Sequence, residues 1–434
     1  MDADFTALAG EPHRILMTCD TVGGVWRYAI DLSRALCLSG NTVTLAAMGP
    51  APSRAQQAEA AAIDGLTLRS RACRLIWMDD PWRDVREAGD WLLRLAEEVR
   101  PDLVHANDFG HVALAWPAPV LCVAHSCVAS WWRAVHRVEA PPQWDRYRAH
   151  VRSALLASDI IVAPSRAMAA ALQTEYGPLR GIRVIPNGTH GVAPANCKKR
   201  ELIFAAGRLW DEAKNLNRLA AIAPGVPWPI YIAGQDCAPD GARATLFNVN
   251  HLGVLRPAAM QRWFARAAIY ALPARYEPFG LSILEAAQAG CALVLGDIPS
   301  LREFWEGAAL FAHPDDGDAL RDALLRLIDD DALRARFGAR ARRRAMFMTA
   351  VRMADEYLAL YDGLLPSPSG RGVGDEGPHK RDASILRESV PSPGASRSRS
   401  ARVRSAPPLP VGEGKSWAEG ARTSVRSRLA GNHA

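Results

Sequence analysis

The stretch of the chain that decides the fold reads Tyr276-Glu277-Pro278-Phe279-Gly280-Leu281-Ser282-Ile283-Leu284-Glu285-Ala286-Ala287. A strand-like apolar run precedes it, Pro278 and Gly280 break the chain, and the residues after Gly280 favour a helix. A strand–turn–helix of this kind leaves the backbone amides of Gly280 and Leu281 at a helix N-terminus, where an anion is stabilised. Glu277 falls in the turn and Glu285 in the helix. The two carboxylates can therefore accept hydrogen bonds from different hydroxyl groups of one sugar-containing ligand.

Outward from this stretch, short apolar strands alternate with amphipathic helices, which predicts parallel sheets covered by helices. In the first part of the chain we expect strands at 14–19, 42–47, 103–105, 119–124, 160–163 and 183–185, and helices at 25–38, 91–99 and 147–156. The pattern restarts with strands at 202–206, 230–233, 269–272 and 292–295, and helices at 216–223, 257–267 and 281–289. Helical segments between 318 and 361 follow. The Gly- and Pro-rich segment 176–200 is the expected junction between two similar α/β units.

A second motif reads Ala206-Gly207-Arg208-Leu209-Trp210-Asp211-Glu212-Ala213-Lys214-Asn215-Leu216. Its glycine turn follows a predicted strand, so Arg208 and Lys214 fall at the strand end where α/β proteins bind ligands. Two cations placed there can neutralise a diphosphate leaving group without a metal. The chain has only five lysines against 47 arginines, so Lys214 is not a background residue. Solvated surface cations are the ordinary alternative for both residues.

Together these motifs resemble the signature of the retaining GT-B glycosyltransferases of family 4, also called glycosyl transferases group 1. The E-x7-E pattern with Pro-Phe-Gly-Leu inside it and the Gly-Arg-Leu…Lys-Asn pattern carry the resemblance. It implies that Glu277 lies by the transferred sugar and that Glu285 holds the nucleotide ribose. It also implies that Arg208 and Lys214 grip the donor diphosphate, and it places Phe279, Gly280 and Leu281 at the donor.

Two further segments agree with the resemblance. Gly23 and Gly24 join a predicted strand to a helix, where adjacent glycines let the backbone approach a ligand closely. The family has such a loop facing donor and acceptor, although tight strand–helix packing explains a Gly-Gly turn equally well. The loop lacks the G-x-G-x-x-G spacing of a nicotinamide site. His125 ends the strand at 119–124, and the resemblance places it close to the donor sugar, whereas a lone histidine is more often structural.

The resemblance covers residues 12–363 and implies a GT-B fold: two Rossmann-like, doubly wound parallel-sheet domains facing a cleft. The expected divisions are an acceptor domain at 12–185, a nucleotide-sugar donor domain at 186–345, a helix at 346–365 crossing back to the first domain, and a disordered basic tail at 366–434. The implied activity is transfer of a sugar from a nucleoside-diphosphate sugar to a glycan, lipid or small-molecule acceptor, with retention of configuration. A nucleotide-sugar epimerase or hydrolase of the same fold, and a catalytically silent binding partner, remain alternatives.

Charge and composition limit the partners. Residues 366–434 hold 12 of the 52 Lys and Arg residues and 6 of the 46 Asp and Glu residues, so residues 1–365 hold 40 of each sign. The body is formally neutral, and we expect no nucleic-acid partner. No metal or cofactor beyond the nucleotide sugar is expected, because no His, Asp or Cys cluster has metal-ligand spacing. Without a signal peptide or a run of roughly 18 apolar residues, we expect a cytoplasmic protein. Peripheral contact with the inner membrane face stays open.

Overall fold

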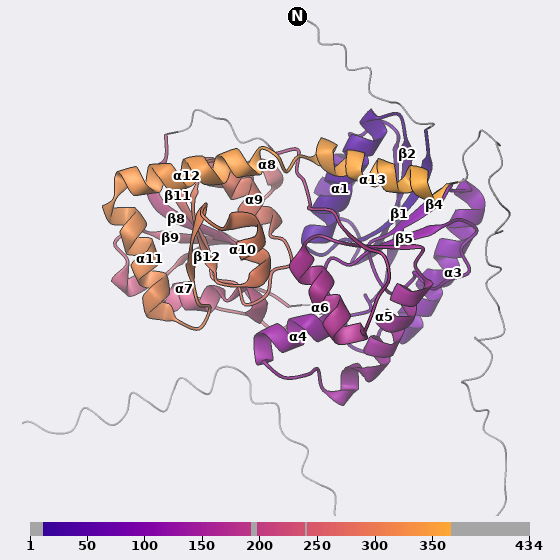
Figure 1. Ribbon diagram of the computed structural model, residues 1–434, viewed down its shortest axis with the longest axis horizontal. Helices are drawn as coiled ribbons and strands as arrows, with labels where there is room; N and C mark the ends of the chain where they lie inside the picture. Colours follow the sequence, from indigo (N-terminus) through magenta and orange to yellow (C-terminus); the bar gives the residue numbers. More distant parts are fainter. Residues whose placement is uncertain (1–11, 192–197, 239–240, 366–434) are drawn as a thin grey trace, which may run out of the picture. The chain divides into compact units, whose positions relative to one another are not determined.

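The computed structural model of the chain describes residues 12–191, 198–238 and 241–365 (Figure 1). The expected disordered tail at 366–434 lies outside these residues. The described residues contain a seven-stranded sheet of order β3-β2-β1-β4-β5-β6-β7 and a six-stranded sheet of order β10-β9-β8-β11-β12-β13. All strand pairs in both sheets are parallel. The chain therefore has the two parallel α/β units that the sequence predicts.

The central strands of the first sheet are largely buried, whereas the edge strands β3 and β7 are partly exposed. Its strands are β1 (Arg14–Asp20), β2 (Thr42–Gly49), β3 (Leu66–Ala72), β4 (Leu103–Ala106), β5 (Val120–Val123), β6 (Ile160–Ala163) and β7 (Ile182–Val184). Its helices are α1 (Gly24–Leu38), α2 (Arg54–Ala61), α3 (Trp82–Val99), α4 (Val128–His136), α5 (Asp145–Ala157) and α6 (Arg166–Tyr176). Every residue of β4 and β5 is buried, which is typical of a parallel sheet with helices on both sides.

The second sheet repeats this plan. Its strands are β8 (Arg200–Ala206), β9 (Ile230–Ala233), β10 (Asn250–His251), β11 (Ala267–Leu272), β12 (Ala292–Gly296) and β13 (Ala309–Ala312). Its helices are α7 (Leu216–Ile222), α8 (Pro257–Arg266), α9 (Leu281–Gln288), α10 (Pro299–Trp305), α11 (Gly317–Asp329) and α12 (Asp331–Ala345), and a short 3₁₀ helix, η2, covers Glu212–Lys214. All of β11 and β12 is buried. We call residues 12–191 the first half and residues 198–345 the second half.

The order of the strands in each sheet predicts where ligands bind. In the first sheet the order reverses between β1 and β4, and in the second sheet it reverses between β8 and β11. Open parallel sheets bind ligands beyond the carboxyl ends of the strands at such switch points. The loops after β1, β4, β8 and β11 are therefore the segments that this fold presents to a ligand.

The last helix, α13 (Ala350–Leu364), packs against α1 of the first half (Figure 1). Its buried residues Met353, Tyr357 and Tyr361 belong to the same apolar cluster as β1 and α1. The Tyr361 hydroxyl lies 2.6 Å from Nδ1 of His105 on β4. Burial lowers the pKa of His105 to about 3, so its ring is neutral and the contact is a hydrogen bond rather than an ion pair.

The chain passes between the halves twice, and the two crossings lie side by side. Thr189 and Thr349 form a parallel bridge, in which the amide of Ala350 donates to the carbonyl of Thr189. A Cβ atom on Gly188 would lie 2.1 Å from the carbonyl oxygen of Thr349. Only glycine fits that approach, so the paired crossings account for this residue.

Candidate active site

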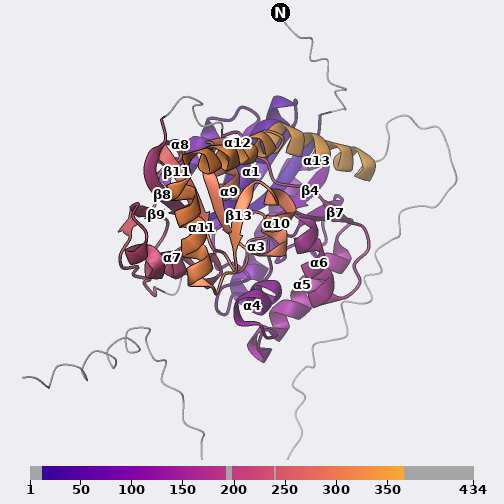
Figure 2. The same cartoon turned by 60° about the vertical axis from the view of Figure 1, so that its left-hand side comes forward.

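Most of the residues singled out by the sequence follow strands that flank the two switch points, and His125 follows β5, the neighbour of β4. Gly23 and Gly24 follow β1, His125 follows β5, Arg208 and Lys214 follow β8, and Glu277 through Leu281 follow β11, with Glu285 inside α9. Figures 1 and 2 show the helices that begin after these strands, among them α1 and α9. Hydrogen bonds and close approaches between the two halves bring several of these residues together.

Both predicted diphosphate-binding cations are held by carboxylates. A guanidinium nitrogen of Arg208 lies 2.6 Å from Oδ2 of Asp211, and Nζ of Lys214 lies 2.6 Å from Oε2 of Glu277. The side chains of Lys214 and Glu277 are 18% and 13% exposed, so this pair is largely shielded from water. Charge-assisted hydrogen bonds of this kind fix the cations in place before any ligand arrives.

Asp211 connects the Arg208 site to the first half of the chain. Its Oδ1 accepts hydrogen bonds from the Ala213 amide and, at 3.1 Å, from the indole Nε1–H of Trp131 on α4. Burial raises the pKa of Asp211, but the charges of Arg208 and Lys214 outweigh it and hold that pKa below its ordinary value. The carboxylate therefore stays ionised and binds three donors at once.

The Gly-Gly turn of the first half also reaches Arg208. A Cβ atom on Gly23 would lie 3.1 Å from Nη1 of Arg208, and one on Gly24 would lie 3.9 Å from Cδ1 of Leu281. Gly23 has φ +86°, a conformation that side chains rarely adopt. The same turn begins with Asp20, whose pKa burial raises to about 7 against the opposing charge of Arg208. The structure thus places the predicted turn against the predicted cation.

His125 is held in one orientation and one tautomer. Asn107, after β4, donates its Nδ2–H to the carbonyl of Thr18 at 2.8 Å, so its Oδ1 accepts from Nε2–H of His125 at 2.8 Å. The Tyr28 ring packs edge-on against the imidazole, with centroids 4.4 Å apart. Burial lowers the pKa of His125 to about 3. The imidazole is neutral, and its Nδ1 lone pair remains able to accept a hydrogen bond.

The loop that carries Glu277 is fixed from both halves. The hydroxyl of the neighbouring Tyr276 lies 2.8 Å from Oγ of Ser130 and accepts the amide hydrogen of Cys127 at 3.3 Å. Tyr276 packs against the buried cluster of the first half. The carbonyl of Glu277 accepts a 2.6 Å hydrogen bond from Ser300 on α10. The backbone at Glu277 is therefore held on one side by Tyr276 and on the other by Ser300.

The remaining predicted donor residues differ in what they offer. The Phe279 side chain is buried and packs edge-on against Phe304, so only its backbone is available to a ligand. Gly280 has φ +93° and supplies no side-chain cap to α9, which leaves the first amides of that helix without a side-chain partner. Burial raises the pKa of Glu285 to about 7, against the charge of Arg27. Glu285 is thus the predicted site carboxylate whose protonation changes near neutral pH.

Sequence reasoning missed several of these residues. Asp211, Trp131, Tyr276, Asn107 and Asp20 form no recognisable spacing. The contacts Trp131–Asp211, Ser130–Tyr276 and Asn107–His125 join residues that are 80, 146 and 18 positions apart. The available signal was their position: Asp20 and Asn107 end the strands next to the first switch point, and Asp211 and Tyr276 follow those next to the second. Strand order, which needs the structure, identifies them.

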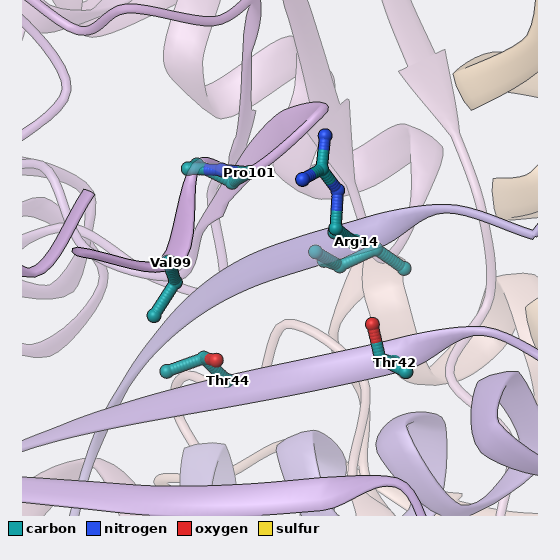
Figure 3. A pocket seen from close by; sticks show the side chains of 6 residues that line it. Arg14, Thr42, Thr44, Val99 and Pro101 are labelled. Atoms are coloured by element: carbon teal, nitrogen blue, oxygen red, sulfur yellow. The ribbon is translucent and has the colours of Figure 1, made fainter. Parts of the chain in front are cut away.

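Three observations concern other site types. Among residues 12–191, 198–238 and 241–365, no three His, Cys, Asp or Glu side chains are grouped so as to hold a metal ion. No helix in that same part of the chain is long and apolar enough to cross a membrane. A hollow of about 90 Å³ lies between the start of β1, at Arg14, the start of β2, at Thr42, and the turn at Pro101 (Figure 3). It is at the amino ends of these strands, the edge opposite to the predicted site.

Comparison with known proteins gives matches over nearly all of the described chain. Residues 22–190 match the family described as Glycosyltransferase Family 4, and residues 200–330 match Glycosyl transferases group 1. The chain is 30% identical over 371 residues to glycogen synthase of Mycobacterium tuberculosis, covering 74% of this chain and 86% of that protein.

Solved structures of low sequence identity share the fold. Sucrose-phosphate synthase from Thermosynechococcus elongatus is similar with a TM-score of 0.64 at 19% identity, covering 81% of this chain and 99% of its own. The Anabaena protein HepE in complex with UDP-glucose is similar with a TM-score of 0.64 at 16% identity, covering 81% of this chain and 100% of its own. These structural similarities show that the chain has the GT-B fold.

Proposed function

This chain belongs to the glycosyltransferases of family 4 and group 1, and from that premise we propose that it transfers a sugar from a nucleoside-diphosphate sugar to an acceptor with retention of configuration. The observation that carries the proposal is the position of Arg208 and Lys214. Both cations follow the strand next to the second switch point, and each is held at 2.6 Å by a carboxylate. Such a pair of fixed cations matches a departing diphosphate.

We assign the donor to the second half. Arg208 and Lys214 would exchange their carboxylate partners for diphosphate oxygens, which need the same charge-assisted hydrogen bonds. The uncapped amides at the start of α9 would add to this binding, since a helix N-terminus attracts negative charge. These groups would supply the charge that a metal supplies elsewhere, so we expect transfer to persist in the presence of a chelator.

Three side chains are assigned to the sugars of the donor. Glu285, inside α9, would accept hydrogen bonds from the ribose hydroxyls. Glu277 would lie by the transferred sugar once Lys214 moves to the diphosphate, and its loop is anchored by Tyr276 and Ser300. His125 would accept a hydrogen bond from a hydroxyl of that sugar at its free Nδ1. No carboxylate is assigned as a covalent nucleophile, in keeping with attack from the same face as the departing diphosphate.

The similar proteins suggest which donors to test first. The HepE structure contains UDP-glucose, and the relative that is 30% identical to this chain is the glycogen synthase of Mycobacterium tuberculosis. We therefore propose a glucosyl donor on uridine or adenosine diphosphate as the starting point, with guanosine diphosphate sugars as the next class.

The test is a thermal-unfolding screen of the full chain with UDP, ADP and GDP and their glucose or mannose conjugates. A ligand at about 100 times its Kd should raise the free energy of unfolding by about 2.7 kcal/mol. Arg208→Ala should lose this stabilisation, whereas Arg86→Ala, which removes an exposed arginine on α3, should keep it.

Product analysis then separates the alternatives. Transfer to an added glucan or other acceptor with retained configuration supports the proposal. Release of free sugar, or of an epimer, without an acceptor would point to a hydrolase or epimerase. Nucleotide binding with no turnover on any acceptor tested would favour a silent partner, and no stabilisation by any nucleotide would contradict the proposed donor site.

A further inference from the structure

An arginine-rich surface lies far from the strand ends that form the candidate active site. Between residues 332 and 354 the sequence has seven arginines and no Asp or Glu, although residues 1–365 as a whole hold equal numbers of both signs. These residues form most of α12, the turn after it and the start of α13. Figures 1 and 2 both show α13 continuing from α12 along the same edge. Positive charge is therefore concentrated on one outer surface of the protein.

Some of these arginines make hydrogen bonds that hold helices together, and others do not. Arg344 donates to the carbonyls of Phe304 and Glu306 at 2.8 and 2.7 Å, so it holds α12 against α10. Arg336 and Arg343 are exposed and have no ion pair in the part of the chain that the structure describes. Arg340 is exposed, lies 3.4 Å from the Gly307 carbonyl and has its guanidinium carbon 5.8 Å from the centre of the Phe337 ring. Helix-dipole stabilisation accounts for the last turn of α12 but does not account for Arg336 and Arg340.

Two of the exposed arginines, Arg340 and Arg343, line an open hollow. The hollow has a volume of about 540 Å³ and is lined by Gly307, Ala308, Arg340, Arg343, Arg344 and Phe347. Arg340 and Arg343 are both exposed and line this depression, and a phosphate group accepts charge-assisted hydrogen bonds from guanidinium groups of this kind. The volume is large enough for a phosphate together with the polar atoms attached to it.

Apolar side chains are exposed in the same stretch of the chain, and one of them, Phe347, lines the hollow. Met346, Phe347 and Val351 are 51%, 69% and 55% exposed, and they are three of the eight large hydrophobic residues that are exposed in the described part of the chain. The phosphate backbone of duplex DNA is bound mainly through charge, and it gains little from an aromatic ring and two aliphatic chains in water. An anionic bilayer gains from both, since basic residues bind its headgroups and apolar side chains enter the boundary with the acyl chains.

We propose that the surface formed by Arg336, Arg340, Arg343, Met346, Phe347 and Val351 docks on an anionic membrane, with a lipid phosphate in the hollow. The proposal does not depend on the donor assignments, because this surface shares no residue with the candidate active site. Each arginine near an anionic surface strengthens binding about fivefold. Loss of Arg340 and Arg343 together should therefore weaken vesicle binding about 25-fold.

The experiment measures co-sedimentation of the full chain with phosphatidylcholine vesicles that contain or lack phosphatidylglycerol. Three variants are compared with the wild type: Arg340→Gln with Arg343→Gln, Phe347→Ser, and the control Arg86→Gln with Arg94→Gln. The control removes the same charge from two exposed arginines on α3 that have no ion pair in the described residues. All four proteins retain the basic segment 366–434, so differences between them report on the surface.

We expect the wild type and the α3 control to bind anionic vesicles equally well and neutral vesicles weakly. The Arg340/Arg343 variant should bind about 25-fold more weakly and Phe347→Ser several-fold more weakly, with unfolding temperatures and nucleotide binding unchanged. Equal binding by the Arg340/Arg343 variant and the α3 control would overturn the proposal. So would an undiminished affinity of Phe347→Ser together with tight, Arg340-dependent binding to a DNA oligonucleotide, since that result identifies a polyanion surface instead.

Discussion

Trp131 of the first half donates its indole Nε1–H to Asp211 of the second half over 3.1 Å, and the same carboxylate binds Arg208 at 2.6 Å. The contact joins α4 to the cation that we assign to the donor diphosphate. Trp131→Phe keeps the ring and removes the donor, so Asp211 loses one of the groups that orient it. A hydrogen bond to a charged group contributes about 1.5 kcal/mol or more, so kcat/KM for the donor should fall roughly tenfold.

Trp132 provides the matched control for this prediction. It is adjacent on the same helix, and its buried indole nitrogen has no hydrogen-bond partner among the residues that the structure describes. Trp132→Phe therefore removes an indole N–H that donates no hydrogen bond among the described residues, and kcat/KM should stay within about twofold of the wild type. Equal losses of kcat/KM in the two variants would mean that activity depends on the size of the ring at either position of α4. The Trp131–Asp211 hydrogen bond would then have no specific effect.

Glu277 should separate donor binding from transfer. In the structure it neutralises Lys214 at 2.6 Å, and in the proposed mechanism it lies by the transferred sugar. Glu277→Gln frees Lys214 for the diphosphate, so the affinity for UDP or ADP should be kept or increased. The loss of charge near the reacting carbon should lower kcat by about 100-fold or more, as removal of a transition-state contact does. Isothermal titration and initial rates measure the two effects, and a parallel loss of nucleotide binding would contradict the assigned role.

The sequence predicts the buried parts of this fold well because buried parallel strands are short, apolar and evenly separated. The expected strands at 160–163 and 230–233 coincide with β6 and β9. The edge strand β3 was not predicted, because it is half exposed and carries Arg69 and Arg71, which conceal an apolar pattern. The helix α4 also went unpredicted, and it carries Trp131, which contacts the site.

The site could be predicted only where its residues are close in the sequence. Glu277, Gly280 and Glu285 lie in one strand–turn–helix, so their spacing reveals them. Trp131 and Asp211 are 80 residues apart, and no local pattern relates them. The same holds for Glu303, whose carboxylate accepts the first two amides of α6, from Arg166 and Ala167. Contacts between the halves depend on how two independently patterned units meet, which a single sequence does not encode locally.

Gly23 should be sensitive for two separable reasons. Its φ of +86° disfavours a side chain, and a Cβ atom there would lie 3.1 Å from Nη1 of Arg208. Gly23→Ala should lower the free energy of unfolding by about 1 kcal/mol through backbone strain and should also displace Arg208, so nucleotide affinity falls roughly tenfold. Gly40→Ala is the control, since Gly40 has φ +87° with nothing within 4 Å of the added Cβ. It should show the same loss of stability with nucleotide affinity unchanged.

Glu285 should make stability depend on pH near neutrality. Burial raises its pKa to about 7 in the folded protein, from an ordinary value of about 4.3 in the unfolded chain. Between these values the folded state binds more protons than the unfolded state, so the free energy of unfolding falls as pH rises from about 4.5 to 7. At about 1.4 kcal/mol per pKa unit, the full effect approaches roughly 4 kcal/mol. Glu285→Gln cannot ionise, so urea titrations at several pH values should show a shallower decline than the wild type or Glu97→Gln, which removes an exposed carboxylate on α3.

Ionisation of Glu285, which lowers the free energy of unfolding, should strengthen nucleotide binding. The ionised carboxylate accepts two ribose hydrogen bonds, whereas the protonated form gives up part of that capacity. Nucleotide affinity of the wild type should therefore rise between pH 6 and pH 8, while the ligand-free protein becomes less stable over the same range. Glu285→Gln should bind nucleotide weakly at both pH values, with a smaller rise between them than the wild type, since Asp20 beside Arg208 also titrates near pH 7. If its affinity rises with pH as in the wild type, another group carries the dependence, and Glu285 does not hold the ribose.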